Sequence, residues 1–301
     1  MPVTRVVPFS SGVGYFEHSG TVHGDMRQLI INSDDFGYTP AVSRGIVEAH
    51  RAGVLTSTSL LPNLSGFEDA VRLAREEAPS LGIGVHINLV QGVPLARVPT
   101  LTDPRTGEFH SMPRLTRLAL TGRIAAEDVA AEGAAQIRRL RDAGVRITHL
   151  DSHKHAHVLP GIWRPLAETA CREGIRAMRW PVPTARVSAW QPGARGKEAL
   201  AALLWRAARR HAPPLRHPDW LVELPAHGAR LDAPGLLRLL DRLPEGTSEL
   251  VVHVGHVDDT LARADKYTWQ RERELAVLTS PEVRERLQRG DFALVHFGVL
   301  A

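Results

Sequence analysis

The sequence predicts an α/β fold, a distorted (β/α) barrel of the TIM type with seven or eight parallel strands. From residue 27 onward, short apolar segments rich in β-branched residues alternate with amphipathic helical segments. The apolar segments are hydrophobic almost throughout, which is typical of parallel strands buried on both faces. Eight such repeats within 301 residues also match the usual size of a (β/α)8 barrel.

The predicted strands are short and lie between turn signals, as strands of a buried parallel sheet do. They cover residues 28–33, 54–61, 83–89, 147–152, 177–181, 221–224, 249–254 and 292–297.

The segments between the strands carry recognisable helix ends. Thr39 and Pro40 begin a helix that Gly53 ends, because threonine caps, proline suits the first turn and glycine adopts the terminating conformation. Ser65 is expected to begin a second helix, and a long third helix ends at Gly144.

Residues 1–25 show neither helical nor strand periodicity, and we expect them to form a disordered N-terminal extension before a single barrel domain at 26–301. They also lack the apolar core of a signal peptide, and no run approaches the roughly 18 apolar residues of a membrane span. A cytoplasmic protein without membrane contact is therefore expected. The single cysteine, Cys171, is expected to be a buried structural residue.

The charge pattern argues against nucleic-acid binding. The net charge is +4, but the arginines are interleaved with aspartate and glutamate, as in "RLAREEAP" and "WQRERELAVL". Such mixing is typical of a solvated surface, and nucleic-acid binding stays the weaker alternative.

Polar side chains gather where the predicted strands end. In a parallel α/β sheet the carboxyl ends of the strands meet at one edge, where ligands bind. We therefore expect these groups to converge. They are Asp34 and Asp35, His86 and Asn88, Asp151, His153, His155 and His157, and His253, His256, Asp258 and Asp259.

The segment "THLDSHKHAH" is the most specific local signal. Its polar residues alternate from 149 to 157, so an extended chain would place imidazoles and a carboxylate on one face, within reach of one ion. A solvent-exposed histidine-rich loop is the alternative. His86 lies in an apolar strand and needs a partner, either a metal or a backbone carbonyl. Asn88 could equally serve only to pin a loop.

Asp34 and Asp35 are adjacent carboxylates, and a divalent cation would offset their repulsion. One could bind the ion while the other acts as a base. The alternative is that they cap the helix that starts near Thr39, but capping explains only one of the two acids. Two imidazoles with one carboxylate favour zinc or another transition ion over magnesium.

The motifs "LIINSDDFG", "TSTSLLPN", "GIGVHINLVQGVPL", "THLDSHKHAH" and "DKYTWQRERELAVLTSPEV" resemble, in order and spacing, those of the YdjC-like (ChbG/HpnK) carbohydrate deacetylases. The resemblance spans about residues 28–298. It implies a distorted barrel, often dimeric, that removes acetyl groups from N-acetylated sugars such as chito-oligosaccharides with one divalent ion, Mg²⁺ or Zn²⁺.

By this resemblance, the metal ligands would be Asp35, His86 and His153, and Asp34 would be the catalytic base. His253 would be the proton donor, with His155 as the substitute. From its position, Asp151 could orient a ligating imidazole.

Two departures from the family pattern affect the site. Val254 follows His253 where many relatives have proline, and Lys154 stands where many have histidine. A metal-dependent hydrolase of another amide or ester, or a non-catalytic sugar-binding barrel, remains an alternative function.

Overall fold

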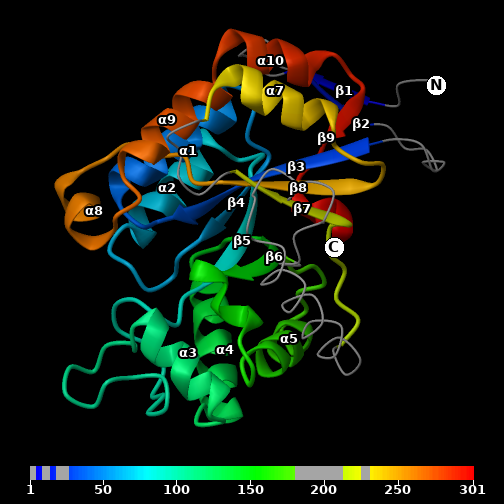
Figure 1. The fold of residues 1–301 in the computed structure, drawn as a ribbon. Coiled ribbons are helices and arrows are strands. Elements are labelled where there is room, and N and C mark those ends of the chain that lie inside the picture. Colours follow the sequence, from blue (N-terminus) through cyan, green and yellow to red (C-terminus); the bar gives the residue numbers. More distant parts are fainter. Residues whose placement is uncertain (1–4, 9–13, 18–26, 180–212, 225–230) are drawn as a thin grey trace.

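The computed structural model describes residues 5–8, 14–17, 27–179, 213–224 and 231–301. Its centre is a seven-stranded sheet with the order β6-β5-β4-β3-β8-β7, in which β9 also pairs with β3. Every pair of neighbours in this sheet is parallel, which confirms the predicted α/β class. Figure 1 shows α3, α4 and α5 below the sheet and α7 and α10 above it.

The strands of this sheet are β3 (Arg27–Phe36), β4 (Ser57–Leu60), β5 (Gly82–Ile87), β6 (Ile147–Ser152), β7 (Trp220–Glu223), β8 (Thr247–Val252) and β9 (Phe292–Leu294). The α-helices are α1 (Pro40–Arg51), α2 (Phe67–Glu77), α3 (Met112–Leu120), α4 (Ala126–Asp142), α5 (Trp163–Arg172), α7 (Ala233–Asp241), α8 (Asp259–Ala264), α9 (Trp269–Leu278) and α10 (Pro281–Gln288). Two 3₁₀ turns follow strands, η1 (His153–Val158) and η3 (Phe297–Leu300).

The sheet is a curled half-barrel, so the prediction of a barrel holds only in this coarser form. Within the described residues the regular ladder ends at β6 and β7. Next to β6, the predicted strand at 177–181 forms only the isolated bridges Leu150–Met178 and Ala177–Arg216, and residues 180 and 181 lie outside the described part. Pro181 follows in the sequence, and proline cannot donate a hydrogen bond to a ladder.

The helix ends largely follow the predicted signals. Thr39 Oγ1 accepts a hydrogen bond from the backbone of Val42, with Pro40 in the first turn of α1. Gly53 and Gly144 have positive φ values of 79° and 78° just beyond α1 and α4. The predicted start at Ser65 is wrong.

Helix α2 begins at Phe67, with Gly66 at the cap position. A Cβ on Gly66 would lie 2.7 Å from the carbonyl oxygen of Gly37, so the close approach of two backbones requires glycine at this cap position.

The expectation of a buried Cys171 is also wrong, because its side chain is exposed on α5.

Within residues 1–25 the structure describes an antiparallel ribbon of β1 (Arg5–Pro8) and β2 (Gly14–Glu17), and the remainder of this stretch lies outside the described part. The disordered extension and the single barrel domain therefore stay predictions. Among the helices that the structure describes, none is long and apolar enough to cross a membrane.

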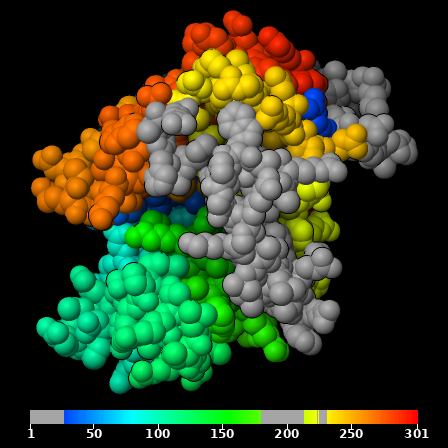
Figure 2. All heavy atoms as spheres, viewed as in Figure 1, coloured from blue at the N-terminus to red at the C-terminus, as the bar shows by residue number. Residues whose placement is uncertain are grey.

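The core lies between the sheet and its helices. Polar side chains lie at one edge of the sheet, at the carboxyl ends of the strands. Leu29, Val85, Leu150 and Leu250 are fully buried strand residues within this core. On the face seen in Figure 2, the α8–α9 segment and the α3–α4 segment form separate protrusions.

Candidate active site

Asp34 and Asp35 both face one cavity because β3 is irregular at its end. In a regular strand, neighbouring side chains point to opposite faces. Here the register against β4 shifts between Ser33 and Phe36, and Asp35 has a φ of 71°. A β-bulge of this kind re-aims a side chain, and a non-glycine residue at positive φ is strained. The capping alternative is not realised, because Thr39 caps α1.

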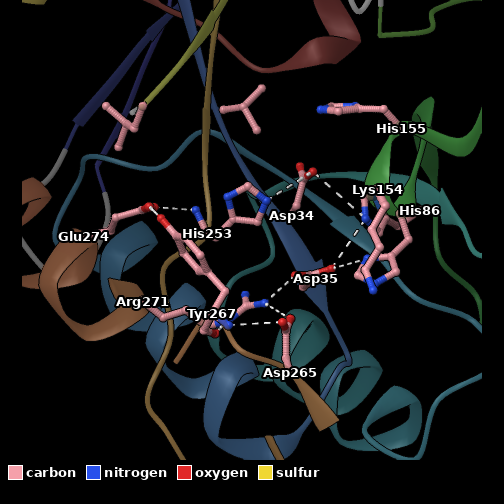
Figure 3. A pocket seen from close by; sticks show the side chains of 13 residues that line it. Asp34, Asp35, His86, Lys154, His155, His253, Asp265, Tyr267, Arg271 and Glu274 are labelled. Atoms are coloured by element: carbon pink, nitrogen blue, oxygen red, sulfur yellow. Dashed lines mark hydrogen bonds and ion pairs between the residues drawn. The ribbon is translucent and has the colours of Figure 1, made fainter. Parts of the chain in front are cut away.

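The cavity encloses about 270 Å³ at the carboxyl ends of the strands. Figure 3 shows His253 turned toward Asp34, while Asp34 and Asp35 both approach His86. The sequence-predicted residues that line it are Asp34, Asp35, His86, His153, His155 and His253. The other residues expected to converge are absent from this lining, namely Asn88, Asp151, His157, His256, Asp258 and Asp259. His256 instead pairs with Glu48 on α1, and Asp258 caps α8.

Asp35, His86 and His153 bring one potential ligand atom each within 4.8 Å of the others, and all three are buried. Asp35 Oδ1 lies 3.5 Å from His86 Nε2 and 2.9 Å from His153 Nδ1. Ligands about 2.1 Å from one ion would lie roughly 3.0–3.4 Å apart, close to these separations.

Both histidines have a buried ring nitrogen that lacks a hydrogen-bond partner. These atoms are His86 Nε2 and His153 Nε2, and such atoms are costly unless a ligand completes them. Asp35 Oδ1 meets only the two imidazoles. Donor type, spacing and missing partners together fit a divalent ion.

Asp151 orients His86 from behind. Its Oδ1 lies 2.7 Å from His86 Nδ1, where Ser59 Oγ also approaches to 3.0 Å, so Nε2 is left for the cavity. Burial lowers the pKa of His86, but the neighbouring Asp151 and Asp34 carboxylates outweigh it and raise that pKa to about 10. A carboxylate behind a ligating imidazole fixes its orientation and increases its basicity.

His153 reaches the cavity from a turn rather than from an extended chain. The prediction that residues 149 to 157 lie on one extended face is wrong, because the strand ends at Ser152 and η1 follows. Lys154 and His155 have positive φ values of 53° and 51° within this turn. His149 instead stacks on Phe297, with ring centroids 3.8 Å apart.

Asp34 is held by a buried arginine that sequence reasoning missed. Arg179 Nη1 and Nη2 donate to the two Asp34 oxygens at 2.8 and 2.6 Å. Burial raises the pKa of Asp34, but Arg179 outweighs it and keeps that pKa below its usual value. Asp34 Oδ2 also lies 4.0 Å from His86 Nε2 and 3.9 Å from His253 Nε2.

His253 follows β8 and stands at the mouth of the cavity, with 37% of its side chain exposed. Its backbone N–H donates to Glu274 at 2.6 Å, and its ring packs against Tyr267 at 5.4 Å between centroids. The imidazole therefore faces Asp34 although Val254 replaces the proline of many relatives.

The side chain of Asn88 makes its hydrogen bonds to the loop after β5 and to Asn63. Its amide donates to Asn63 Oδ1 and the Gln91 carbonyl, while its oxygen accepts from the backbones of Val90 and Gln91. This geometry favours the loop-pinning alternative for Asn88.

A second missed arginine, Arg271 of α9, supports Asp35. Its Nη2 lies 2.7 Å from Asp35 Oδ2 and 3.3 Å from Asp265. Burial raises the pKa of Asp35, but Arg271 and His153 hold it well below its usual value. The sequence carries a signal for Arg179 and for Glu249 of β8, which accepts a hydrogen bond from Arg179 Nε. Both are charged residues in apolar strand patterns, the feature that singled out His86.

The model of the family described as YdjC-like protein matches residues 28–289. The chain belongs to the YdjC-like family. It is 36% identical to a carbohydrate deacetylase of Geobacillus stearothermophilus over 88% of this chain and 94% of that protein. It is 32% identical to a chitooligosaccharide deacetylase of an Enterobacter species over 90% of this chain and 98% of that protein.

Among solved structures, this YdjC-like chain is similar to a crystal structure from Enterococcus faecalis, provisionally named for cellobiose-phosphate cleavage. The TM-score is 0.76 at 30% identity, and the match covers 92% of this chain and 99% of that one.

Proposed function

We propose that the protein is a metal-dependent carbohydrate deacetylase, which hydrolyses the acetamide of N-acetylated sugars such as chito-oligosaccharides to an amine and acetate. Its YdjC-like relatives carry the names carbohydrate deacetylase and chitooligosaccharide deacetylase. The observation that carries the proposal is the cavity floor. There, the three buried potential ligands Asp35, His86 and His153 lie close together beside Asp34, a carboxylate that an arginine holds.

Asp35, His86 and His153 would hold one divalent ion, and their two imidazoles favour Zn²⁺ over Mg²⁺. When bound, such an ion supplies an acidified water and polarises the acetyl carbonyl. Because these three residues are buried, the local dielectric constant is low, which strengthens both effects.

Asp34 would act as the general base. Its low pKa keeps it ionised at neutral pH, and its Oδ2 lies within 4.0 Å of His86, beside the proposed ligands. His253 would protonate the departing amine, since it faces Asp34 from the opposite wall at 3.9 Å. His155, which also lines the cavity, is the substitute donor.

The test is acetate release from a panel of N-acetylated sugars of different lengths, with and without a chelator. We expect release that the chelator abolishes and that added Zn²⁺ or Mg²⁺ restores. No release from any sugar, with metal supplied, would exclude the deacetylase.

The same assay with a panel of other amides and esters would detect a hydrolase of different specificity. Sugar binding without turnover would indicate a non-catalytic barrel. The expected cytoplasmic location and homodimer stay predictions, which cell fractionation and light scattering would check.

A further inference from the structure

Two buried donor sets share His86, one at the cavity and one extending behind it to Asp151. One is the set proposed for the ion, and the other consists of Asp34, His86 and Asp151, all buried and equally close together. His86 offers Nε2 to the first set and Nδ1 to Asp151. Ligand type and spacing alone would therefore allow a second ion, on the other side of the His86 ring.

The two sets differ in how their oxygens are occupied. Asp35 Oδ1 meets only the imidazoles of His153 and His86, which are themselves potential ligands, whereas both oxygens of Asp34 accept from the guanidinium of Arg179. Asp151 Oδ2 lies 2.9 Å from Arg179 Nη1, and its Oδ1 is taken by His86. An ion bound at about 2.0–2.2 Å from these oxygens would need the space in which the guanidinium lies.

The guanidinium is fixed from two sides. Arg179 donates its backbone N–H to Leu150 of β6 at 2.9 Å, which anchors its main chain beside the sheet. Glu249 of β8 accepts from Nε and Nη2, both at 2.8 Å. The side chains of Arg179 and Glu249 are fully buried, so this arrangement is closed to solvent.

We infer that Arg179 is a built-in cation that fills the second donor set and excludes a second metal ion, so that Asp34 does not become a metal ligand. The inference rests on the proposed metal-dependent function. Three carboxylates, those of Asp34, Asp151 and Glu249, surround the single guanidinium. Without it, their buried charge would demand another cation or protons.

The experiment measures metal stoichiometry. Wild type, Arg179→Ala and Arg179→Lys are dialysed against Mn²⁺ or Zn²⁺ and analysed for metal per chain, and the Mn²⁺ samples are examined by electron paramagnetic resonance. The Ala variant vacates the space, whereas Lys keeps a cation there. We expect one ion per chain in wild type and Arg179→Lys, and two in Arg179→Ala, with the spectrum of two coupled Mn²⁺ ions.

The double variant Arg179→Ala/Glu249→Gln is included in case Arg179→Ala does not fold. It leaves one buried carboxylate fewer without a cation. We expect it to bind two ions as well. One ion or none in a folded Ala variant overturns the inference. Failure of both Ala variants to fold in excess metal also overturns it, because a vacated site should be refilled. A wild type that binds no ion would instead remove the proposed metal dependence itself.

Discussion

Replacing Asp34 and Asp35 one at a time by asparagine separates the two proposed roles of these adjacent acids. Asparagine keeps the size of each side chain and tolerates positive φ, so the 71° φ of Asp35 need not change. Asp35→Asn removes a charged donor from the proposed set, and we expect metal affinity to fall by more than the 10- to 100-fold typical of an outer-shell partner. Asp34→Asn should keep about one ion per chain and lower kcat by about 10²–10⁴-fold, the usual contribution of a general base.

The two variants should also differ in stability. Breaking a buried ion pair costs about 3–5 kcal/mol. Arg271 keeps Asp265 at 3.3 Å after Asp35→Asn, so we expect the lower end, about 3 kcal/mol, and a fall in Tm of about 6 °C. Asp34→Asn should cost less, because Arg179 still pairs with Asp151 and Glu249.

Elemental analysis, titration calorimetry and thermal melts measure these differences, with acetate release as the activity assay. The division of roles is refuted if Asp34→Asn loses the ion as fully as Asp35→Asn does. It is equally refuted if Asp35→Asn retains wild-type affinity for the metal.

Three further predictions concern neighbouring residues. Asp151→Asn should weaken metal binding about 10- to 100-fold, measured by calorimetry, because His86 loses its orienting carboxylate at 2.7 Å; unchanged affinity would contradict this. His253→Ala should lower kcat about 10²–10⁴-fold with metal content unchanged, and a normal rate would move the donor role to His155. Burial raises the pKa of Glu249 from 4.5 to about 7, so the folded state binds the extra proton and stability falls by about 3 kcal/mol as pH rises from 4.5 to 7. Glu249→Gln should reduce this dependence of the free energy of unfolding on pH, measured by urea unfolding at several pH values. The same pH dependence in the variant and in wild type would exclude Glu249 as its source.

The sequence by itself determined the parallel α/β class and most of the strands, because buried parallel strands are apolar throughout and their helices carry explicit end signals. It also identified six residues of the cavity lining, among them the three proposed metal ligands, since polar groups at the ends of such strands must meet at one edge. Local chemistry was enough for these conclusions.

Only the tertiary structure decided how the polar groups pair. The bulge that turns both Asp34 and Asp35 into one cavity depends on the register against β4. Arg179 reaches Asp34 from 145 positions away, and Arg271 reaches Asp35 across 236. No local pattern encodes contacts at such separations, because they arise from the packing of β3 against elements distant in the chain.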